Sequence, residues 1–354
     1  MEYYKIDGMT IQINLKSICN LDCDYCLLPK HVKSQKENDN EIIDNTVVLI
    51  NNIKAENIDV KAFAVFGAEP FTVGYDIMGS VLNLMTEAFP NAFLKIQTNG
   101  TLCTPKYMEK FMKVFKYPER LLIGFSMDGV KDIHNKHRCD SWDLMVTNFV
   151  WIKSNTPINT NVICTTNIEH YDDGQYEQEL VEFIETMEHK WNTKVTISYA
   201  DLTIRNVGDT HIGETEFSAK FASFLIRNDY IKKCVKLFQP NYCYRKGNDC
   251  DKTLFDLNKG KTYQCEKEFS PDKEFIQWKD HKISEVMTVR HNRTKDYLIS
   301  KECDTCEYQD WCNGGCPLKR DVNGLAKSCY VTKTVLTHVK ENINPDWRAY
   351  LNKR

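Results

Sequence analysis

The sequence lacks the features of a secreted or membrane-spanning protein. Its first residues contain no basic segment followed by an apolar core, so we expect no signal peptide. No run approaches the ~20 apolar residues that a membrane-spanning helix needs. The net charge is −3, which lacks the positive surplus typical of nucleic-acid binding. With no internal repeat or low-complexity segment either, we expect a globular cytoplasmic protein without a nucleic-acid or membrane partner.

Cysteine, in contrast, is abundant, with fifteen residues in 354. Thiols stay reduced in the cytoplasm, so this number indicates metal ligation rather than disulfides. Three cysteines lie close to the N-terminus and eight lie between positions 243 and 329. The remaining four match no motif: Cys103, Cys139, Cys164 and Cys234. Of these, Cys164 falls in a predicted strand, where we expect a small core residue.

The first group, Cys19, Cys23 and Cys26, has the spacing C-x3-C-x2-C and follows Thr10–Leu15, an alternating segment that predicts a strand. Iron–sulfur clusters are normally held by four thiolates. Three thiolates on one loop would leave one iron of a [4Fe–4S] cluster open to another ligand. A zinc site would need a fourth ligand, and this spacing is unusual for zinc. The spacing favours the open cluster over a partial zinc site or incidental thiols.

From residue 41 to about residue 200 the pattern alternates between helices and strands. Such alternation predicts an α/β fold with a parallel sheet and right-handed crossovers, as a partial barrel. Helices are expected over 41–57, 75–89, from Thr104-Pro105 onward, 141–154 and 175–191, and strands over 60–66, 92–97, 121–126, 158–164 and 195–199. Binding sites in such folds lie beyond the C-terminal strand ends. The cysteine loop, Glu69, Gln97–Asn99 and Ser126–Asp128 all fall at that edge.

These features resemble the radical S-adenosylmethionine (SAM) enzymes, which carry CxxxCxxC after the first strand. Tyr25 matches the family's aromatic residue before the third cysteine, and Gly67-Ala68-Glu69-Pro70 matches its GGEP loop with the second glycine replaced. The resemblance implies that Cys19, Cys23 and Cys26 bind a [4Fe–4S] cluster whose open iron is chelated by SAM. It further implies a cofactor-binding set of Tyr25, Gly67, Ala68, Glu69, Gln97, Asn99, Ser126, Asp128 and Arg138.

For two members of this set the residues leave alternatives open. Glu69 could be an exposed acid in a loop, and Arg138 could form a surface ion pair. The radical SAM interpretation assigns Glu69 and the backbone beside it to the amino group of SAM. It assigns Ser126, Asp128 and Arg138 to the ribose or the carboxylate. In this family, electron transfer from the cluster cleaves SAM and yields a 5′-deoxyadenosyl radical that abstracts hydrogen from the substrate.

The second group contains eight cysteines within 87 residues, enough for two four-ligand sites. Cys303-x2-Cys306-x5-Cys312-x3-Cys316 is followed by Cys329, and Cys243-x6-Cys250-x9-Gly260-x4-Cys265 lies upstream. The last cysteine of such a tight run can serve a different cluster from the others. Two structural zinc ribbons are the alternative interpretation.

This arrangement resembles the SPASM extension of peptide-modifying radical SAM enzymes. The resemblance implies a first auxiliary cluster on Cys243, Cys250, Cys265 and Cys316, and a second on Cys303, Cys306, Cys312 and Cys329. It implies three [4Fe–4S] clusters in all. The expected fold is a partial (β/α)6 TIM-like barrel with a C-terminal cysteine-rich SPASM domain. Its divisions are a core over 1–200, a helical connector over 201–240, the SPASM domain over 241–340 and a tail over 341–354.

Within the connector, an amphipathic pattern of aromatic and aliphatic residues predicts a core-facing helix. Its members are Phe217, Phe221, Phe224, Leu225, Ile231, Val235 and Phe238. Glu266, directly after Cys265, occupies the position where sulfatase-maturating relatives place an aspartate that acts as a base. The resemblance therefore suggests Glu266 as the catalytic base. A solvated acid in the run Glu266-Lys267-Glu268 is the alternative.

The SPASM resemblance implies a peptide or protein substrate and a flavodoxin- or ferredoxin-type reductant. We favour a maturase that forms a cyclophane or thioether crosslink in a ribosomally made precursor peptide by net two-electron oxidation. Only 18 residues precede Cys19, so we expect recognition of the precursor by a separate protein or directly. Oxidation of a sulfatase cysteine or serine to formylglycine is the alternative. A non-catalytic electron carrier or zinc-binding regulator is a third hypothesis.

Five features of the sequence bear on the choice between the peptide maturase and the sulfatase maturase. The segments Gln97–Thr101 and Ser126–Gly129, with His134-Asn135, suit sulfatase maturation. Two features do not suit sulfatase maturation: the glutamate at position 266 and the segment Leu27-Leu28-Pro29-Lys30 after the cluster loop.

Overall fold

The computed structural model describes residues 9–26, 39, 41–167, 169–172, 174–199, 214–234, 254–263, 277–286, 288, 298–315, 320–326 and 328–352. Cys243, Cys250, Cys265, Cys316 and Glu266 lie outside the described residues, as do Val235 and Phe238. Within these ranges, no helix is long and apolar enough to cross a membrane.

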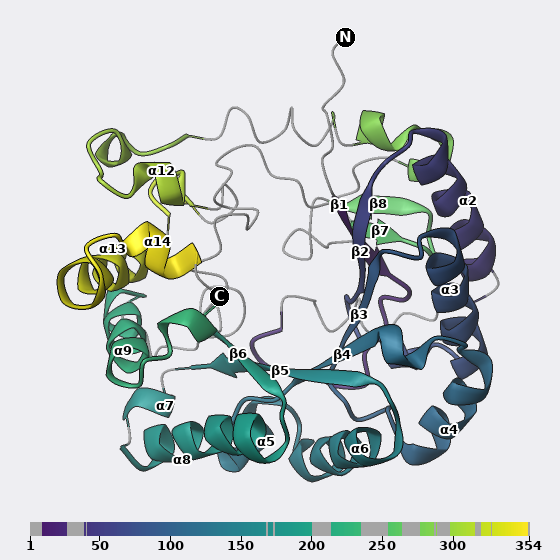
Figure 1. Cartoon of the computed structure of the whole chain (residues 1–354), viewed down its shortest axis with the longest axis horizontal. Coiled ribbons are helices and arrows are strands. Elements are labelled where there is room, and N and C mark those ends of the chain that lie inside the picture. The colour runs from purple at the N-terminus through teal and green to yellow at the C-terminus, as the bar shows by residue number, and fades with distance from the viewer. Residues whose placement is uncertain are drawn as a thin grey trace.

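The centre of the fold is an eight-stranded sheet with the order β6-β5-β4-β3-β2-β1-β7-β8. Strands β1 to β6 pair in parallel with their neighbours, which confirms the predicted α/β sheet. Their bounds are β1 (Met9–Asn14), β2 (Val60–Val65), β3 (Phe93–Thr98), β4 (Leu121–Ser126), β5 (Asn159–Thr166) and β6 (Lys194–Tyr199). In Figure 1 these strands follow an arc, and helices cover its outer side.

The covering helices agree with the sequence pattern within a few residues. They are α2 (Ile42–Ala55), α3 (Tyr75–Ala88), α4 (Pro105–Val114), α6 (Trp142–Asn155) and α8 (Gly174–Glu185). Thr104 caps α4, because its side chain accepts a hydrogen bond from Tyr107 N at 3.3 Å. The helix predicted over 175–191 is divided, with a π-helical turn at η3 (Thr186–Lys190) after α8. Two short helices, α5 (Lys131–His137) and α7 (Glu169–Asp172), were not predicted.

The C-terminal part of the chain contributes two strands to the same sheet. Strand β7 (Leu254–Asp256) pairs in parallel with β1, and Asn14 Nδ2 donates to Asp256 Oδ2 at 3.1 Å. Strand β8 (Lys261–Tyr263) pairs with β7 in antiparallel orientation. Gly260, the glycine of the C-x9-G-x4-C motif, has φ +67° in the turn between them. Residues 254–263, in the C-terminal part of the chain, are therefore hydrogen-bonded into the barrel sheet itself.

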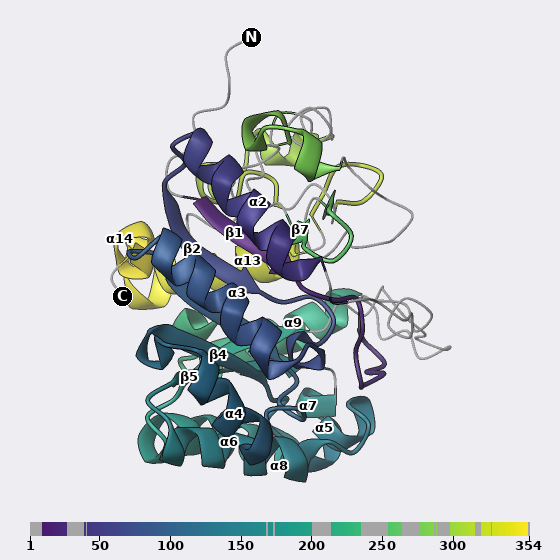
Figure 2. The same cartoon turned by 90° about the vertical axis from the view of Figure 1, so that its right-hand side faces the viewer.

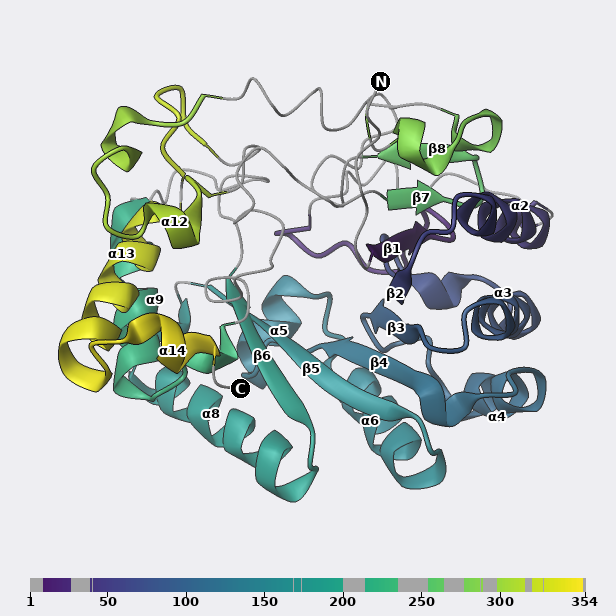
Figure 3. The same cartoon turned by 45° about the horizontal axis from the view of Figure 1, so that its top comes forward.

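A second group of helices lies beyond the opposite edge of the sheet, next to β6 (Figure 3). It consists of α9 (Glu214–Arg227), α13 (Cys329–His338), which packs against α9, and α14 (Trp347–Asn352). Phe217, Phe221 and Phe224 of α9 are buried, which confirms for these three the prediction that the connector aromatics are core residues. Figure 2 shows α2 and α3 side by side on the outer face of β1 and β2.

The remaining described elements are short. They are η1 (Pro70–Thr72), η2 (Pro118–Arg120), η4 (Ile231–Lys233), η6 (Trp278–Asp280), η7 (Lys301–Cys303), α12 (Gln309–Cys312) and the π-helical turn η9 (Val339–Ile343). Cys164 in β5 is fully buried, as expected of a small core residue.

Candidate active site

The loop with Cys19, Cys23 and Cys26 follows β1 and is attached to three neighbouring segments at the C-terminal edge of the sheet. Glu69 N donates to Ile18 O at 3.0 Å, and Asn20 Nδ2 donates to Thr101 Oγ1 at 2.7 Å. Further along, Asp24 N donates to His137 O at 3.3 Å. The exits of β2 and β3 and the end of α5 therefore hold the cysteine loop in place.

Nitrogen donors approach two of the three thiols in this loop. Asn99 Nδ2 lies 3.8 Å from Cys19 Sγ, and Arg138 Nη1 lies 3.9 Å from Cys23 Sγ. Cys23 is buried, whereas Cys19 and Cys26 are half-buried. Hydrogen-bond donors and a guanidinium beside sulfur favour the thiolate form that binds iron. The donor set therefore fits an iron–sulfur cluster at this loop.

Glu69 is completely buried, so the alternative of an exposed loop acid is wrong. Its Oε1 accepts hydrogen bonds from Phe71 N at 3.1 Å and Thr98 Oγ1 at 2.7 Å, and its Oε2 accepts one from Asn99 N at 2.8 Å. Burial raises the pKa of Glu69 to about 7, although these three donors oppose the shift. Both carboxylate oxygens of Glu69 are already hydrogen-bonded, and so are its backbone N and O. The backbone of Gly67 and Ala68 is therefore the part of the motif left to contact a ligand.

Gly67, the first residue of this loop, has φ +138°. A Cβ atom at this position would lie 2.2 Å from Asn14 Oδ1, so the loop can approach β1 only without a side chain. Position 68, where the family motif has a second glycine, accommodates alanine without positive φ.

We predict that Gly67→Ala lowers the free energy of unfolding by about 2–4 kcal/mol, since it combines an unfavourable φ with a steric clash. Gly174→Ala at the start of α8 is the matched control, because an added Cβ there meets nothing within 4 Å. Its expected effect is within about 1 kcal/mol. Equilibrium urea unfolding of both variants checks this, and equal effects of the two substitutions would contradict it.

Asp128, Tyr25 and Arg138 form one buried group next to the cysteine loop. Asp128 Oδ2 accepts hydrogen bonds from Tyr25 Oη at 2.5 Å and Arg138 Nε at 2.9 Å, and the guanidinium lies 5.1 Å from the Tyr25 ring centroid. Burial acts to raise the pKa of Asp128, but Arg138, His134 and Tyr25 together hold it below its usual value. Arg138 is only 8% exposed, so its ion pair is internal rather than on the surface.

Two histidines hold Asp128 in position. The sequence analysis assigned neither of them to the site. His134 in α5 accepts a hydrogen bond from Asp128 N at Nδ1 (3.3 Å), and burial lowers its pKa to about 4, so it is neutral. His170 Nε2 donates to Asp128 O at 2.8 Å. The sequence offered only the pair His134-Asn135 as a hint, and nothing marked His170. Both contacts hold the backbone of Asp128 from opposite sides.

The remaining predicted SAM contacts divide into two kinds. Asn99 uses its side chain to hold the loop, since Oδ1 accepts from Thr101 N and Oγ1 and Nδ2 donates to Asn20 Oδ1. Gln97 Nε2 donates to Ser126 Oγ at 3.0 Å. In contrast, Gln97 Oε1 and Asp128 Oδ1 are buried without a hydrogen-bond partner among the described residues. Such acceptors fit a ligand that carries hydroxyl or amino donors, as SAM does.

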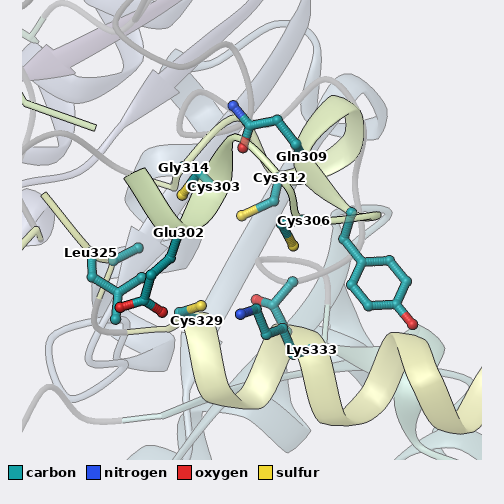
Figure 4. A pocket seen from close by; sticks show the side chains of 12 residues that line it. Glu302, Cys303, Cys306, Gln309, Cys312, Gly314, Leu325, Cys329 and Lys333 are labelled. Atoms are coloured by element: carbon teal, nitrogen blue, oxygen red, sulfur yellow. The ribbon is translucent and has the colours of Figure 1, made fainter. Parts of the chain in front are cut away.

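Four cysteines of the second group line a separate pocket. Figure 4 shows the sulfur atoms of Cys303, Cys306, Cys312 and Cys329 facing the same space, with the amino group of Lys333 beside Cys329. These are the four residues that the SPASM resemblance assigns to the second auxiliary cluster. The structure therefore brings together residues that are separated by up to 26 positions in the sequence.

Local backbone geometry orients these thiols. Cys303 ends η7, which Ser300 caps, and Cys312 ends α12. The next three residues, Asn313, Gly314 and Gly315, all have positive φ and turn the chain away. Arg320 stabilises that turn by donating to the carbonyl oxygens of residues 313, 314 and 315. Cys329 is the first residue of α13, so the helix presents its N-terminus to the pocket.

The four thiols of the pocket fit an iron–sulfur cluster by their chemistry. Among the residues that the structure describes, no group of three or more His, Cys, Asp or Glu side chains is placed to hold one metal ion. The four thiols instead surround a space. Burial raises the pKa of Cys329 to about 11, with Lys333 opposing the shift, so a positive group is needed to favour the thiolate. The helix N-terminus and Lys333 supply positive potential for an anionic cluster.

The fold and this site together define a class of protein: a parallel α/β barrel with a cysteine loop at its C-terminal edge and a second cysteine site outside it. Residues 13–187 match the radical SAM superfamily. The chain therefore contains a radical SAM domain and is an enzyme of this class.

Several proteins are similar to the chain over most of its length. The cysteine-type anaerobic sulfatase-maturating enzyme of Clostridium perfringens (strain 13 / Type A) is 23% identical over 333 residues, covering 86% of this chain and 87% of that one. The structure of native anSMEcpe with bound AdoMet and Cp18Cys peptide has a TM-score of 0.72 at 18% identity, covering 97% and 99%. Streptococcus suis SuiB bound to precursor peptide SuiA has a TM-score of 0.65 at 12% identity, covering 92% and 76%.

Proposed function

We propose that this enzyme is a radical SAM/SPASM maturase that oxidises a peptide by two electrons and forms an intramolecular C–C or thioether crosslink. The observation that carries the proposal is the pocket of Cys303, Cys306, Cys312 and Cys329. A fully ligated cluster has no open iron for SAM, and its use is electron transfer. A substrate radical that becomes a crosslink must lose one further electron, which an auxiliary cluster can accept.

In this proposal, Cys19, Cys23 and Cys26 hold the SAM-binding [4Fe–4S] cluster, and the pocket holds the second auxiliary cluster. Cys243, Cys250, Cys265 and Cys316 hold the first auxiliary cluster, and Glu266 accepts the proton released on oxidation. When bound there, the cluster and SAM would supply the radical chemistry that removes hydrogen from the substrate. Asp128 Oδ1 and Gln97 Oε1 accept hydrogen bonds from SAM, while Tyr25 and Arg138 keep Asp128 ionised and oriented.

The peptide substrate is supported by the solved structures in which anSMEcpe holds the Cp18Cys peptide and SuiB holds SuiA. The sulfatase alternative is supported by the similarity to the cysteine-type anaerobic sulfatase-maturating enzyme over 86% of the chain. The glutamate at position 266 and the segment Leu27-Leu28-Pro29-Lys30 depart from that branch and favour crosslinking. The reductant is proposed to be a flavodoxin or ferredoxin.

Product analysis distinguishes these alternatives. Reduced enzyme with SAM is incubated with peptides from the gene neighbourhood and, separately, with a sulfatase-derived cysteine peptide. Crosslinking removes two hydrogens and leaves no aldehyde, whereas formylglycine reacts with a hydrazide probe. Aldehyde labelling of the sulfatase peptide, without any crosslinked product, would assign the enzyme to sulfatase maturation.

Anaerobically reconstituted protein is predicted to contain about twelve irons, as three [4Fe–4S] clusters. The reason is the number of cysteine ligands, eleven in the three proposed sets. Iron and acid-labile sulfide analysis, with zinc measured on the same sample, checks this prediction. About four irons together with nearly two zinc ions per chain would contradict the auxiliary clusters.

Lys333 is predicted to raise the reduction potential of the cluster in the Cys303–Cys329 pocket, because a nearby cation stabilises the more negative reduced form. Lys333→Met should lower that potential by an amount on the order of tens of millivolts. Lys340→Met is the control, since Lys340 is exposed and paired with Glu307. Redox titration, monitored by electron paramagnetic resonance, measures the reduction potential of this cluster in both variants. Equal shifts of the potential in the two variants would contradict the prediction.

A further inference from the structure

The outer face of the sheet is apolar, whereas its concave face carries several polar side chains. Along β3, Leu94 and Ile96 are buried in the core beneath the covering helices. Successive residues of a strand point to opposite faces, so Lys95 and Gln97 lie on the concave face of the arc. The pairing register places Gln97 beside Gly124 of β4, and Gly124 beside Asn161 of β5. The concave face of these strands therefore carries the polar side chains of Lys95, Gln97 and Asn161, with Leu122 of β4 beside Lys95.

Buried hydrogen-bond acceptors on this face have no partner among the described residues. They are Gln12 Oε1, Gln97 Oε1 and Asn161 Oδ1. An added Cβ on Gly124 would lie 2.3 Å from Gln97 Oε1 and 2.8 Å from Asn161 Oδ1, so both amide oxygens converge above this glycine. Buried acceptors without partners are rare in folded proteins. Gln97 Oε1 is already assigned to SAM, so it is Gln12 Oε1 and Asn161 Oδ1 that indicate a second ligand with N–H or O–H donors.

Lys95 lies in the same region. The register places it beside Ala64 of β2, and Ala64 beside Gln12 of β1, so a small side chain separates Lys95 from the Gln12 amide. Lys95 is half-buried, and no described acidic side chain forms an ion pair with it. Burial lowers its pKa, as expected of an ammonium group that has lost water without gaining a counter-charge. An anion bound on the concave face would compensate the positive charge of Lys95.

We propose that Lys95 is a specificity-determining residue that pairs with a carboxylate of the peptide substrate. Gln12 Oε1 and Asn161 Oδ1 then accept hydrogen bonds from backbone N–H groups of the same peptide. The carboxylate belongs either to an aspartate or glutamate side chain or to the C-terminus of the peptide. This inference rests on the proposed peptide-modifying function and adds the chemistry that selects the peptide.

The position of Lys95 separates this contact from the SAM site. Lys95 precedes Thr98, the last residue of β3, by three positions, which corresponds to about 10 Å along the strand. The cysteine loop, Glu69 and Asp128 all lie at the C-terminal edge. Since the SAM contacts are proposed for that edge, the carboxylate at Lys95 belongs to a molecule that extends deeper over the concave face.

The test uses reconstituted full-length enzyme with SAM and synthetic pools of decapeptides randomised at eight positions, with free or amidated C-termini. Bound peptides are separated from unbound ones and sequenced by mass spectrometry. For the wild-type enzyme we expect enrichment of Asp or Glu at one position, or of free over amidated C-termini. The two pools distinguish these sources. Lys95→Met should reduce the affinity of the enriched peptides by about tenfold to hundredfold. Lys95→Glu should instead enrich Lys or Arg.

Lys61→Met is the matched control, because Lys61 lies on the neighbouring strand β2, is 63% exposed and pairs with Asp59. It should select the same peptides as the wild type. Iron content and circular dichroism of each variant verify folding. Identical selection by wild type and Lys95→Glu would overturn the inference, as would loss of SAM affinity with unchanged peptide preference. If the wild-type enzyme cleaves SAM but modifies no peptide, the proposed function fails instead, whatever Lys95 selects.

Discussion

Replacing Cys19, Cys23 and Cys26 together by alanine is expected to abolish formation of 5′-deoxyadenosine while the protein keeps about eight irons. The three thiols are the proposed ligands of the SAM-binding cluster. Asn99 and Arg138, which approach their sulfur atoms, cannot bind iron in their place. The remaining irons are those of the two auxiliary sites, whose proposed ligands are unchanged. Chromatography of the reaction products and iron analysis measure both quantities.

Cys139→Ala is the control for loss of a thiol at this place. Cys139 is exposed, and its sulfur accepts a hydrogen bond from Asp22 N at 3.4 Å, so it lies against the same loop without belonging to the motif. This variant should keep its iron and its SAM cleavage. Undiminished 5′-deoxyadenosine from the triple variant would refute the assignment of the loop. Equal losses in the triple variant and Cys139→Ala would indicate general damage to the loop rather than loss of ligands.

Removing one ligand of the cysteine pocket, by Cys312→Ala or Cys329→Ala, is expected to leave SAM cleavage in place and to abolish the oxidised peptide. Radical generation depends on the loop after β1, whereas the second oxidation step depends on the auxiliary clusters. The pocket lies on α12 and α13, outside the strands that carry the SAM site. The measurements are 5′-deoxyadenosine and the crosslinked peptide, which is lighter than its precursor by two hydrogens, in the same reaction.

Ser328→Ala is the control for this experiment. Ser328 directly precedes Cys329 at the start of α13 and makes no side-chain capping hydrogen bond, so the change should be mild. Loss of a cluster can also unfold a metal-stabilised segment, so retained helical content and SAM binding are required of each variant. Normal yields of modified peptide from folded Cys312→Ala protein would show that the electron leaves by another route.

The strands and helices of the barrel could be predicted from the sequence because each has one apolar face. Leu121–Ser126, for example, was predicted at its observed bounds. Helix α5 could not be predicted in this way, because its seven residues bury only Ile133 and His134. Strand β7 was missed because it has three residues and is stabilised by pairing with β1, more than 200 positions earlier. Such pairing leaves no periodic pattern in the sequence.

The sequence by itself determined the class of chemistry, because cysteine spacing reflects how many thiols one loop can present to iron. It also determined the order of strands and helices, through apolar periodicity. Only the tertiary structure decided how Glu69 is used, since two of its three donors, Thr98 and Asn99, lie at the end of β3, away from its own loop. The tertiary structure also placed Lys95 on the same face of the sheet as Gln12, with Ala64 between them, and brought Cys303, Cys306, Cys312 and Cys329 together. Contacts between distant segments depend on strand register and helix packing, which local sequence patterns do not encode.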